Sequence, residues 1–206
     1  MTSHPLLTSG GRNALETVLN LLASERASVS SVRDPAQAWR VHVDDSLSAL
    51  DLPDLAGSPR IADLGSGAGF PGLALAATLP QSSVALIESV GRKCRFMERV
   101  IAEAQIANAT VICKRSEDWA NGDGREAYDV VTARAVGRLS ELAELASPLL
   151  RAGGALIAWK GHRDAEEEEE LGSAAHDLAM EPETVMAVNP YPVSYTHLTL
   201  PTICSV

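Results

Sequence analysis

The chain has 206 residues and a formal net charge of −10, and 46% of its residues are hydrophobic against 21% charged, which suits one folded core and excludes a disordered chain. No apolar run approaches the roughly 18 residues of a membrane span, and the N-terminus lacks the basic and then apolar pattern of a secretory signal. The three cysteines form no CxxC pair and no metal-ligand spacing, so we expect a cytoplasmic protein without a disulfide framework, a metal site or a membrane partner.

The first 55 residues predict helices. Leu15 and Leu22 belong to an apolar pattern at helical spacing between residues 11 and 25. The serine-rich stretch Ser28–Ser31 interrupts this pattern, and Asp34 followed by Pro35 predicts the N-cap and first turn of a second helix that runs to about residue 50. We expect residues 1–55 to form a helical extension packed on the same domain as the rest of the chain.

From residue 60 the pattern changes to strands that alternate with helices. The predicted strands cover residues 60–64, 83–88, 110–113, 128–132 and 154–159, and the predicted helices cover residues 71–79, 91–105, 117–120 and 139–150. Such alternation, with nearly continuous apolar strands, is typical of an α/β protein whose mostly parallel sheet has helices on both faces. Residues 56–190 are expected to form this domain.

The end of the chain differs in composition. Residues 191–206 contain no charged side chain but hold two of the three tyrosines and two of the 11 prolines. No pattern places this segment in the sheet, so we expect an atypical tail that resembles a foreign or truncated end more than a closing strand. A sheet without a closing strand would keep an unpaired edge.

The negative charge is also uneven. Residues 61–165 carry 12 basic and 12 acidic side chains, whereas residues 166–206 carry 8 acids and no lysine or arginine. Six basic side chains lie between residues 91 and 115. The net charge therefore does not exclude a polyanionic partner, because one face of the protein can be basic.

A glycine-rich segment, Asp63–Gly69, lies where the first predicted strand meets the next helix. Glycines there permit positive φ angles and a close approach of the backbone to a ligand. A dinucleotide site requires G-x-G-x-x-G, but the sixth position here is Phe70 and the third glycine comes at the fifth. This spacing is similar to that of S-adenosylmethionine-dependent methyltransferases and disfavours a dehydrogenase. Gly65 and Gly67 are therefore candidate cofactor-binding residues.

Polar residues follow the next two strands at the same expected edge of the sheet. Glu88 ends the second strand, at a distance from Gly65 that suits a carboxylate binding both ribose hydroxyls; the alternative is a solvated acid. Ser116 and Glu117 follow the third strand, where they either meet the adenine edge or form the N-cap and first turn of a short helix.

Four stretches carry a more specific pattern. They read IADLGSGAGFPG (61–72), LIESVGRKCRF (86–96), YDVVTARAV (128–136) and LLRAGGALIAWKG (149–161). In this order they closely resemble the glucose-inhibited division protein B family (RsmG), methyltransferases of small-subunit ribosomal RNA. Upstream, residues 33–35 (RDP) and 42–47 (HVDDSL) resemble the N-terminal helical element of that family. The resemblance implies a Rossmann-like class I methyltransferase fold.

The resemblance also implies the reaction, which is transfer of a methyl group from S-adenosylmethionine to N7 of a guanine in 16S ribosomal RNA, free or in the small ribosomal subunit. Carried over position by position, the cofactor contacts are Gly65, Phe70, Ser116, Glu117 and Arg134. For Arg134 the alternative is a surface arginine paired with an acid. Guanine N7 already has a lone pair, so no general base is required, and we assign no catalytic residue.

Basic residues are candidate contacts to RNA phosphates, because the charged backbone supplies much of the affinity for RNA. They are Arg92, Lys93, Arg95, Lys160 and Arg163, of which Lys160 is favoured, and each has the alternative of a solvated surface charge. Two other functions stay open at this point: methylation of a small molecule or protein, and a non-catalytic module that binds the cofactor. The sequence does not determine the oligomeric state, and a monomer is favoured.

Overall fold

The computed structural model describes residues 4–25, 34–57, 59–134, 136–161, 164–185 and 200–205. Its elements are α1 (Ser9–Ser24), α2 (Pro35–Ala38), the π-helical turn η1 (Trp39–Asp44), α3 (Asp45–Leu47), the 3₁₀ turn η2 (Pro53–Leu55), β1 (Arg60–Leu64), α4 (Gly72–Thr78), β2 (Ser83–Ile87), α5 (Gly91–Ala104), β3 (Ala109–Ile112), α6 (Ser116–Ala120), β4 (Tyr128–Arg134), α7 (Leu139–Ala146), β5 (Leu150–Lys160), α8 (Ala165–Asp177), β6 (Glu181–Val185) and β7 (Leu200–Ser205). Within these ranges no helix is both long and apolar enough to span a membrane. The serine-rich stretch and residues 191–199 lie outside the described residues.

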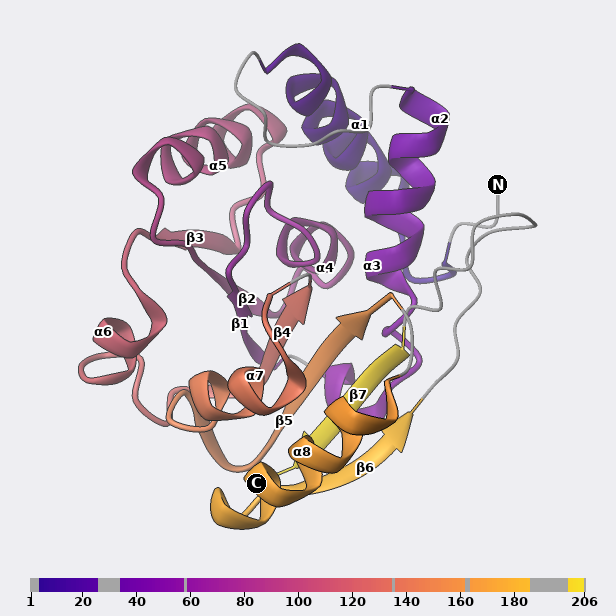
Figure 1. Cartoon of the computed structure of the whole chain (residues 1–206). Coiled ribbons are helices and arrows are strands. Elements are labelled where there is room, and N and C mark those ends of the chain that lie inside the picture. The colour runs from indigo at the N-terminus through magenta and orange to yellow at the C-terminus, as the bar shows by residue number, and fades with distance from the viewer. Residues whose placement is uncertain are drawn as a thin grey trace.

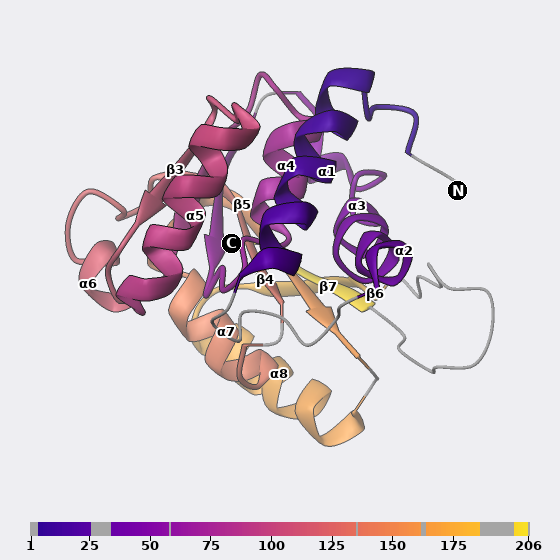
Figure 2. The ribbon, with the colours of Figure 1, turned by 90° about the horizontal axis from the view of Figure 1, so that it is seen from above.

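The described strands form one sheet in the order β3-β2-β1-β4-β5-β7-β6 (Figure 1). The first five strands of that order are parallel, and β7 is antiparallel to both β5 and β6. Seen from above, α1, α4 and α5 cover one face and α7 and α8 cover the other (Figure 2). This confirms the predicted α/β fold. The strand order reverses between β1 and β4, and ligands of such sheets bind at the carboxyl ends of strands beside this reversal.

Each face of the sheet has its own buried cluster. Successive strand residues point to opposite faces, so Ile61 of β1 packs with α1, α4 and α5, whereas Ala62 packs with α7 and α8. Residues 61–64 of β1 are all buried, which is why the strand is apolar at three of these four positions, with Asp63 as the exception. The central strands are therefore held from both sides, and their carboxyl ends have fixed positions.

The N-terminal helices pack into the first of these clusters. Leu15 of α1 and Val43 of η1 are fully buried in it. Oδ2 of Asp34 accepts a hydrogen bond from the Gln37 amide at 2.7 Å, which confirms the predicted N-cap. The predicted second helix is unbroken from residue 35 to 47, but residues 39–44 within it form a π-helical turn in which the Asp45 amide donates a hydrogen bond to the Arg40 carbonyl. Single π-helical turns are frequent at functional sites.

Three strands differ from the sequence prediction, which has no strand at residues 181–185, where the structure has β6. β5 begins at Leu150, which pairs with Tyr128 ahead of a bulge that contains Gly153 at φ 73°. Residues 200–205 were not expected in the sheet, yet their backbone forms β7 between β5 and β6. β-Strand pairing is made by main-chain groups and does not require an alternating side-chain pattern. Residues 200–205 lack such a pattern, so their sequence does not predict the strand.

Replacing Leu15 by alanine should lower the free energy of unfolding by about 2–5 kcal/mol, because it removes a fully buried side chain and leaves a cavity between α1 and the rest of the core. Leu6→Ala is the matched control, since Leu6 is 51% exposed and its loss should cost less than about 0.5 kcal/mol. Urea unfolding measures both. Equal effects would show that α1 does not belong to the main core.

Candidate functional site

The loop between β1 and α4 has the backbone shape that its glycines predict. Gly65, Gly67 and Gly69 have φ angles of 65°, 58° and 97°, in the region that strains other residues. A Cβ atom on Gly65 would lie 2.7 Å from Cγ2 of Val136, on the segment after β4. Gly65 itself is exposed, so the first turn of the loop presents bare backbone at the carboxyl edge of the sheet.

Glu88 connects this loop to the end of β2. Its side chain is 6% exposed, Oε2 accepts a hydrogen bond from the Gly67 amide at 3.0 Å, and Oε1 accepts one from the Val90 amide at 2.9 Å. Nζ of Lys93 lies 3.5 Å from Oε2. The solvated acid that was the alternative is thus not what the structure contains. A carboxylate has about four lone-pair sites, so Glu88 can still accept hydrogen bonds from a ligand.

Asp63 holds the loop from inside the protein. It is fully buried; Oδ1 accepts a hydrogen bond from Oγ1 of Thr132 on β4 at 2.9 Å, and Oδ2 accepts one from the Gly72 amide at 3.1 Å. Burial raises the pKa of Asp63 to about 6, although these hydrogen bonds act in the opposite direction. A Cβ atom on Gly72 would lie 2.8 Å from Oδ2, so α4 can begin against this carboxylate only because residue 72 is glycine.

Ser116 and Glu117 form the first turn of α6, directly after β3. Oγ of Ser116 donates to Oε2 of Glu117 at 2.9 Å, and this hydrogen bond, with that from the Glu117 amide, lowers the pKa of the carboxyl group. Glu117 is exposed, and the N-cap residue is Arg115 rather than Ser116. Glu117 is thus accessible at the edge where the adenine is expected, whereas Ser116 is partly buried.

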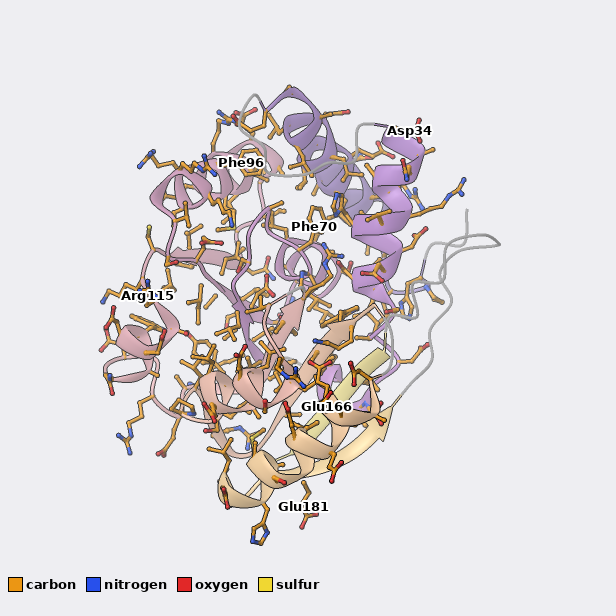
Figure 3. All side chains as sticks on the ribbon, in the orientation of Figure 1. Asp34, Phe70, Phe96, Arg115, Glu166 and Glu181 are labelled. Carbon is orange, nitrogen blue, oxygen red and sulfur yellow. The ribbon has the colours of Figure 1, made fainter. Side chains whose placement is uncertain are left out.

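Phe70 and Arg134 join the loop to the N-terminal helices. The Phe70 ring is buried and stacks on His42, with ring centroids 5.0 Å apart, and the Arg134 guanidinium lies 5.8 Å from the Phe70 centroid. Figure 3 shows Phe70 beside α4 on the side of these helices, whereas Arg115 lies at the outer end near α6. The Phe70 ring thus supports the loop from its N-terminal side.

Arg134 ends β4 and reaches into the N-terminal helical element. Nη1 donates to Oδ2 of Asp45 at 2.9 Å and to the Val41 carbonyl at 3.1 Å, and Nη2 lies 3.4 Å from Nδ1 of His42. The Asp45 side chain is 6% exposed and that of Arg134 is 17% exposed. The pairing with an acid, which was the alternative for Arg134, is present, but the pair is largely buried rather than on the surface.

The residues predicted to contact RNA are divided. Arg92 and Arg95 are exposed on the first turns of α5, and Lys93 is directed to Glu88. Lys160 binds Oε1 of Glu167 on α8 at 2.6 Å and the Gly137 carbonyl at 3.1 Å, so in this structure it connects β5 to α8. Arg163 lies outside the described residues.

The sequence reasoning missed the role of the N-terminal element in the site. In the sequence, Asp45 and His42 stand out only as members of the HVDDSL stretch. That stretch was the available signal, because a family-like motif far from the glycine loop indicates a part that meets the loop in space. Thr132 and Val136, which lie against Asp63 and Gly65, carried no signal of their own.

The donor set fits S-adenosylmethionine. The glycine loop gives bare backbone, Glu88 gives a carboxylate of the kind that binds ribose hydroxyls, and Arg134 gives a cation of the kind that binds an amino-acid carboxylate. Among the described residues there is no cluster of three or more side chains that could hold a metal ion.

Solved structures share this fold. The chain superposes with a TM-score of 0.61 on a SAM-dependent methyltransferase from Aquifex aeolicus, at 15% identity, covering 87% of this chain and 97% of that one. Fibrillarin from Aeropyrum pernix, with natively bound S-adenosyl-L-methionine, gives a TM-score of 0.60 at 18% identity over 79% of this chain and 73% of that one. These likenesses show that the chain has the Rossmann-like fold of class I S-adenosylmethionine-dependent methyltransferases.

Sequence relatives identify the family to which the chain belongs within this fold class. Residues 13–192 match the family described as rRNA small subunit methyltransferase G. The Sorangium cellulosum protein of that name is 41% identical over 75% of this chain and 64% of the relative, and the Staphylococcus carnosus protein is 36% identical over 77% and 68%. The chain therefore belongs to the rRNA small subunit methyltransferase G family, as its motifs predicted. It spans slightly less than two thirds of the Sorangium protein.

Lowering the pH from 7 to 5 should destabilise the wild-type protein by about 2 kcal/mol more than a His42→Gln variant. Burial, and then the charge of Arg134, lower the pKa of His42 from 6.5 to about 4. Between these values the unfolded chain binds more protons than the folded one, so the stabilisation present above pH 6.5 is lost as the pH falls toward 4. Urea unfolding at both pH values measures the difference.

Asp63 is present in both proteins of this comparison, so the opposite contribution of its raised pKa cancels in the difference. Equal losses of stability in the wild type and the variant would contradict the assignment of a neutral, buried His42.

Proposed function

We propose that this chain transfers a methyl group from S-adenosylmethionine to N7 of a specific guanine in 16S ribosomal RNA, in the cytoplasm where ribosomal subunits are found. The observation that carries the proposal is the meeting of the glycine loop, Glu88 and Arg134 at one edge of the sheet, in a chain of this family. Free 16S RNA and the small ribosomal subunit are both candidate substrates.

The cofactor would be held by groups from four loops at this edge. Glu88 would accept hydrogen bonds from the ribose hydroxyls, Arg134 would pair with the carboxylate of the methionine part, and Ser116 and Glu117 would meet the adenine edge. Gly65 and Gly67 would allow the ligand to approach the backbone. Phe70 would act through its packing on His42.

The reaction does not require the protein to supply an acid, a base or a nucleophile. When bound, S-adenosylmethionine supplies a methyl group from its sulfonium, and the lone pair of guanine N7 accepts it without prior removal of a proton. The chain's task is then to hold the base in line at near-attack distance and to exclude water, which can contribute roughly 7–11 kcal/mol. No general base is therefore assigned.

Exposed cations flank the same edge and would contact RNA phosphates. Arg92 and Arg95 follow β2, and Lys114 and Arg115 follow β3. Nζ of Lys114 lies 5.2 Å from the centroid of the Trp119 ring, which keeps it close to α6. Lys160 is the weaker candidate, because its ammonium group already binds Glu167.

Label from S-adenosyl-[methyl-³H]methionine should map to one guanine N7 when the protein is incubated with unmodified 16S RNA or small subunits. Glu88→Ala should weaken cofactor binding by roughly tenfold or more, since it removes a charged acceptor from the ribose site. Titration calorimetry measures this affinity, and Glu88→Gln keeps the shape if the alanine variant is unstable.

Glu98→Ala is the matched control, because Glu98 is an exposed carboxylate on α5 and its loss should leave binding unchanged. If label appeared on protein or on an unrelated RNA and none on 16S RNA, the proposed substrate would be wrong. Absence of cofactor binding in the wild type would overturn the proposal itself.

Replacing Arg92 and Arg95 by alanine should weaken RNA binding and reduce the slope of log K against log salt concentration by about 1 for each phosphate that the protein no longer neutralises. Cofactor affinity should not change. Filter binding over a salt series measures the slope. Arg125→Ala, which removes an exposed arginine on the segment between α6 and β4, is the control; an equal effect there would indicate nonspecific attraction only.

A further inference from the structure

Asp45 is fixed by contacts with the sheet as well as with its own helix. Its carbonyl oxygen accepts a hydrogen bond from Nε1 of Trp159 on β5 at 3.0 Å, and its carboxylate binds Arg134 at the end of β4. Its amide is bonded to the Arg40 carbonyl at the end of the π-helical turn. Main chain and side chain of Asp45 are thus both held relative to the two strands that border the cofactor edge.

These contacts determine the orientation of the Arg134 guanidinium. The bonds from Nη1 to Asp45 and to Val41, and the approach of Nη2 to His42, involve three of the five N–H groups. Burial lowers the pKa of His42 to about 4, so its ring is neutral at neutral pH, and Nδ1 accepts such a bond in the tautomer that carries the proton on Nε2. Within the described residues, the other two N–H groups have no acceptor at hydrogen-bonding distance and can bind a ligand.

A buried ion pair is weak grounds for a purely stabilising role, because desolvation of the two charges offsets most of their attraction. An oriented guanidinium, in contrast, binds a carboxylate through two parallel hydrogen bonds. The negative charge of Asp45 also offsets the positive charge of Arg134, which reduces the repulsion between the guanidinium and a sulfonium bound nearby.

We propose that Asp45 is a positioning residue of the cofactor site: it holds the Arg134 guanidinium so that its remaining N–H groups bind the carboxylate of the methionine part of S-adenosylmethionine. This inference rests on the proposed function, since it assigns that cofactor to the edge. It makes the N-terminal helical element a working part of the cofactor site, although the element has no residue in the glycine loop.

The test compares two ligands that differ in the amino-acid part. S-adenosylhomocysteine has the carboxylate, and 5′-methylthioadenosine lacks it. Asp45→Ala should weaken binding of S-adenosylhomocysteine by roughly tenfold and leave binding of methylthioadenosine unchanged, because only the first ligand uses Arg134. Titration calorimetry measures both affinities, and Asp45→Asn should give a smaller loss since it keeps one acceptor for Nη1.

Asp44→Ala is the matched control. Asp44 is the neighbouring acid, but its Oδ1 accepts a hydrogen bond from Nε1 of Trp39 at 2.9 Å rather than from Arg134. This variant should bind both ligands within about twofold of the wild type. In an Arg134→Ala background, Asp45→Asn should have no further effect on S-adenosylhomocysteine, because the two residues act in sequence.

The other outcomes separate the two proposals. Equal losses for both ligands, or no loss for S-adenosylhomocysteine, would overturn the positioning role while the proposed function stands. Weaker RNA binding with unchanged S-adenosylhomocysteine binding would also overturn it, and would assign Arg134 to a phosphate. A wild-type protein that binds neither ligand would overturn both.

Discussion

The buried carboxylate of Asp63 connects three segments that are far apart in the sequence, and the geometry of the cofactor edge depends on this connection. Asp63 lies one residue before the end of β1, and its carboxylate accepts hydrogen bonds from Thr132 on β4 and from the first amide of α4. A buried acceptor of this kind keeps its partners because leaving either donor unsatisfied costs about 1–3 kcal/mol. The glycine loop therefore has few accessible backbone conformations, because both of its ends are fixed. The positive φ angles between these ends follow from the turn that the loop must make.

Glu88, at the end of the neighbouring strand β2, also holds the glycine loop by a hydrogen bond, but its carboxylate can accept further ones. Asp63 is fully enclosed, whereas Glu88 is buried except for 6% of its surface and shares its oxygens between the loop and the start of α5. The two acids thus have distinct roles that follow from their surroundings. One is structural and protonates more readily because it is buried, and the other keeps its lone pairs within reach of a ligand.

Much of this arrangement could be predicted from the sequence because it is local. Strand and helix alternation, the glycine spacing and the cap at Asp34 depend on neighbouring residues, and each leaves a pattern in the sequence. The contact between Asp45 and Arg134 joins residues 89 positions apart and leaves none. Lys160 shows the same limit, since nothing near it in the sequence indicates that Glu167 on the following helix faces it. The π-helical turn could not be predicted either, because no residue type in it distinguishes it from an α-helix.

The position of β7 sets the order in which the sheet can be completed. β6 precedes it in the chain but, among the described strands, pairs with β7 alone, so residues 181–185 belong to the sheet only through residues 200–205. During synthesis, which proceeds at about 5–20 residues per second, the parallel half can assemble while the last strands are still inside the ribosome. β7 is thus the strand that converts β5 from an edge strand into an interior one, and β6 then forms the edge of the described sheet on this side.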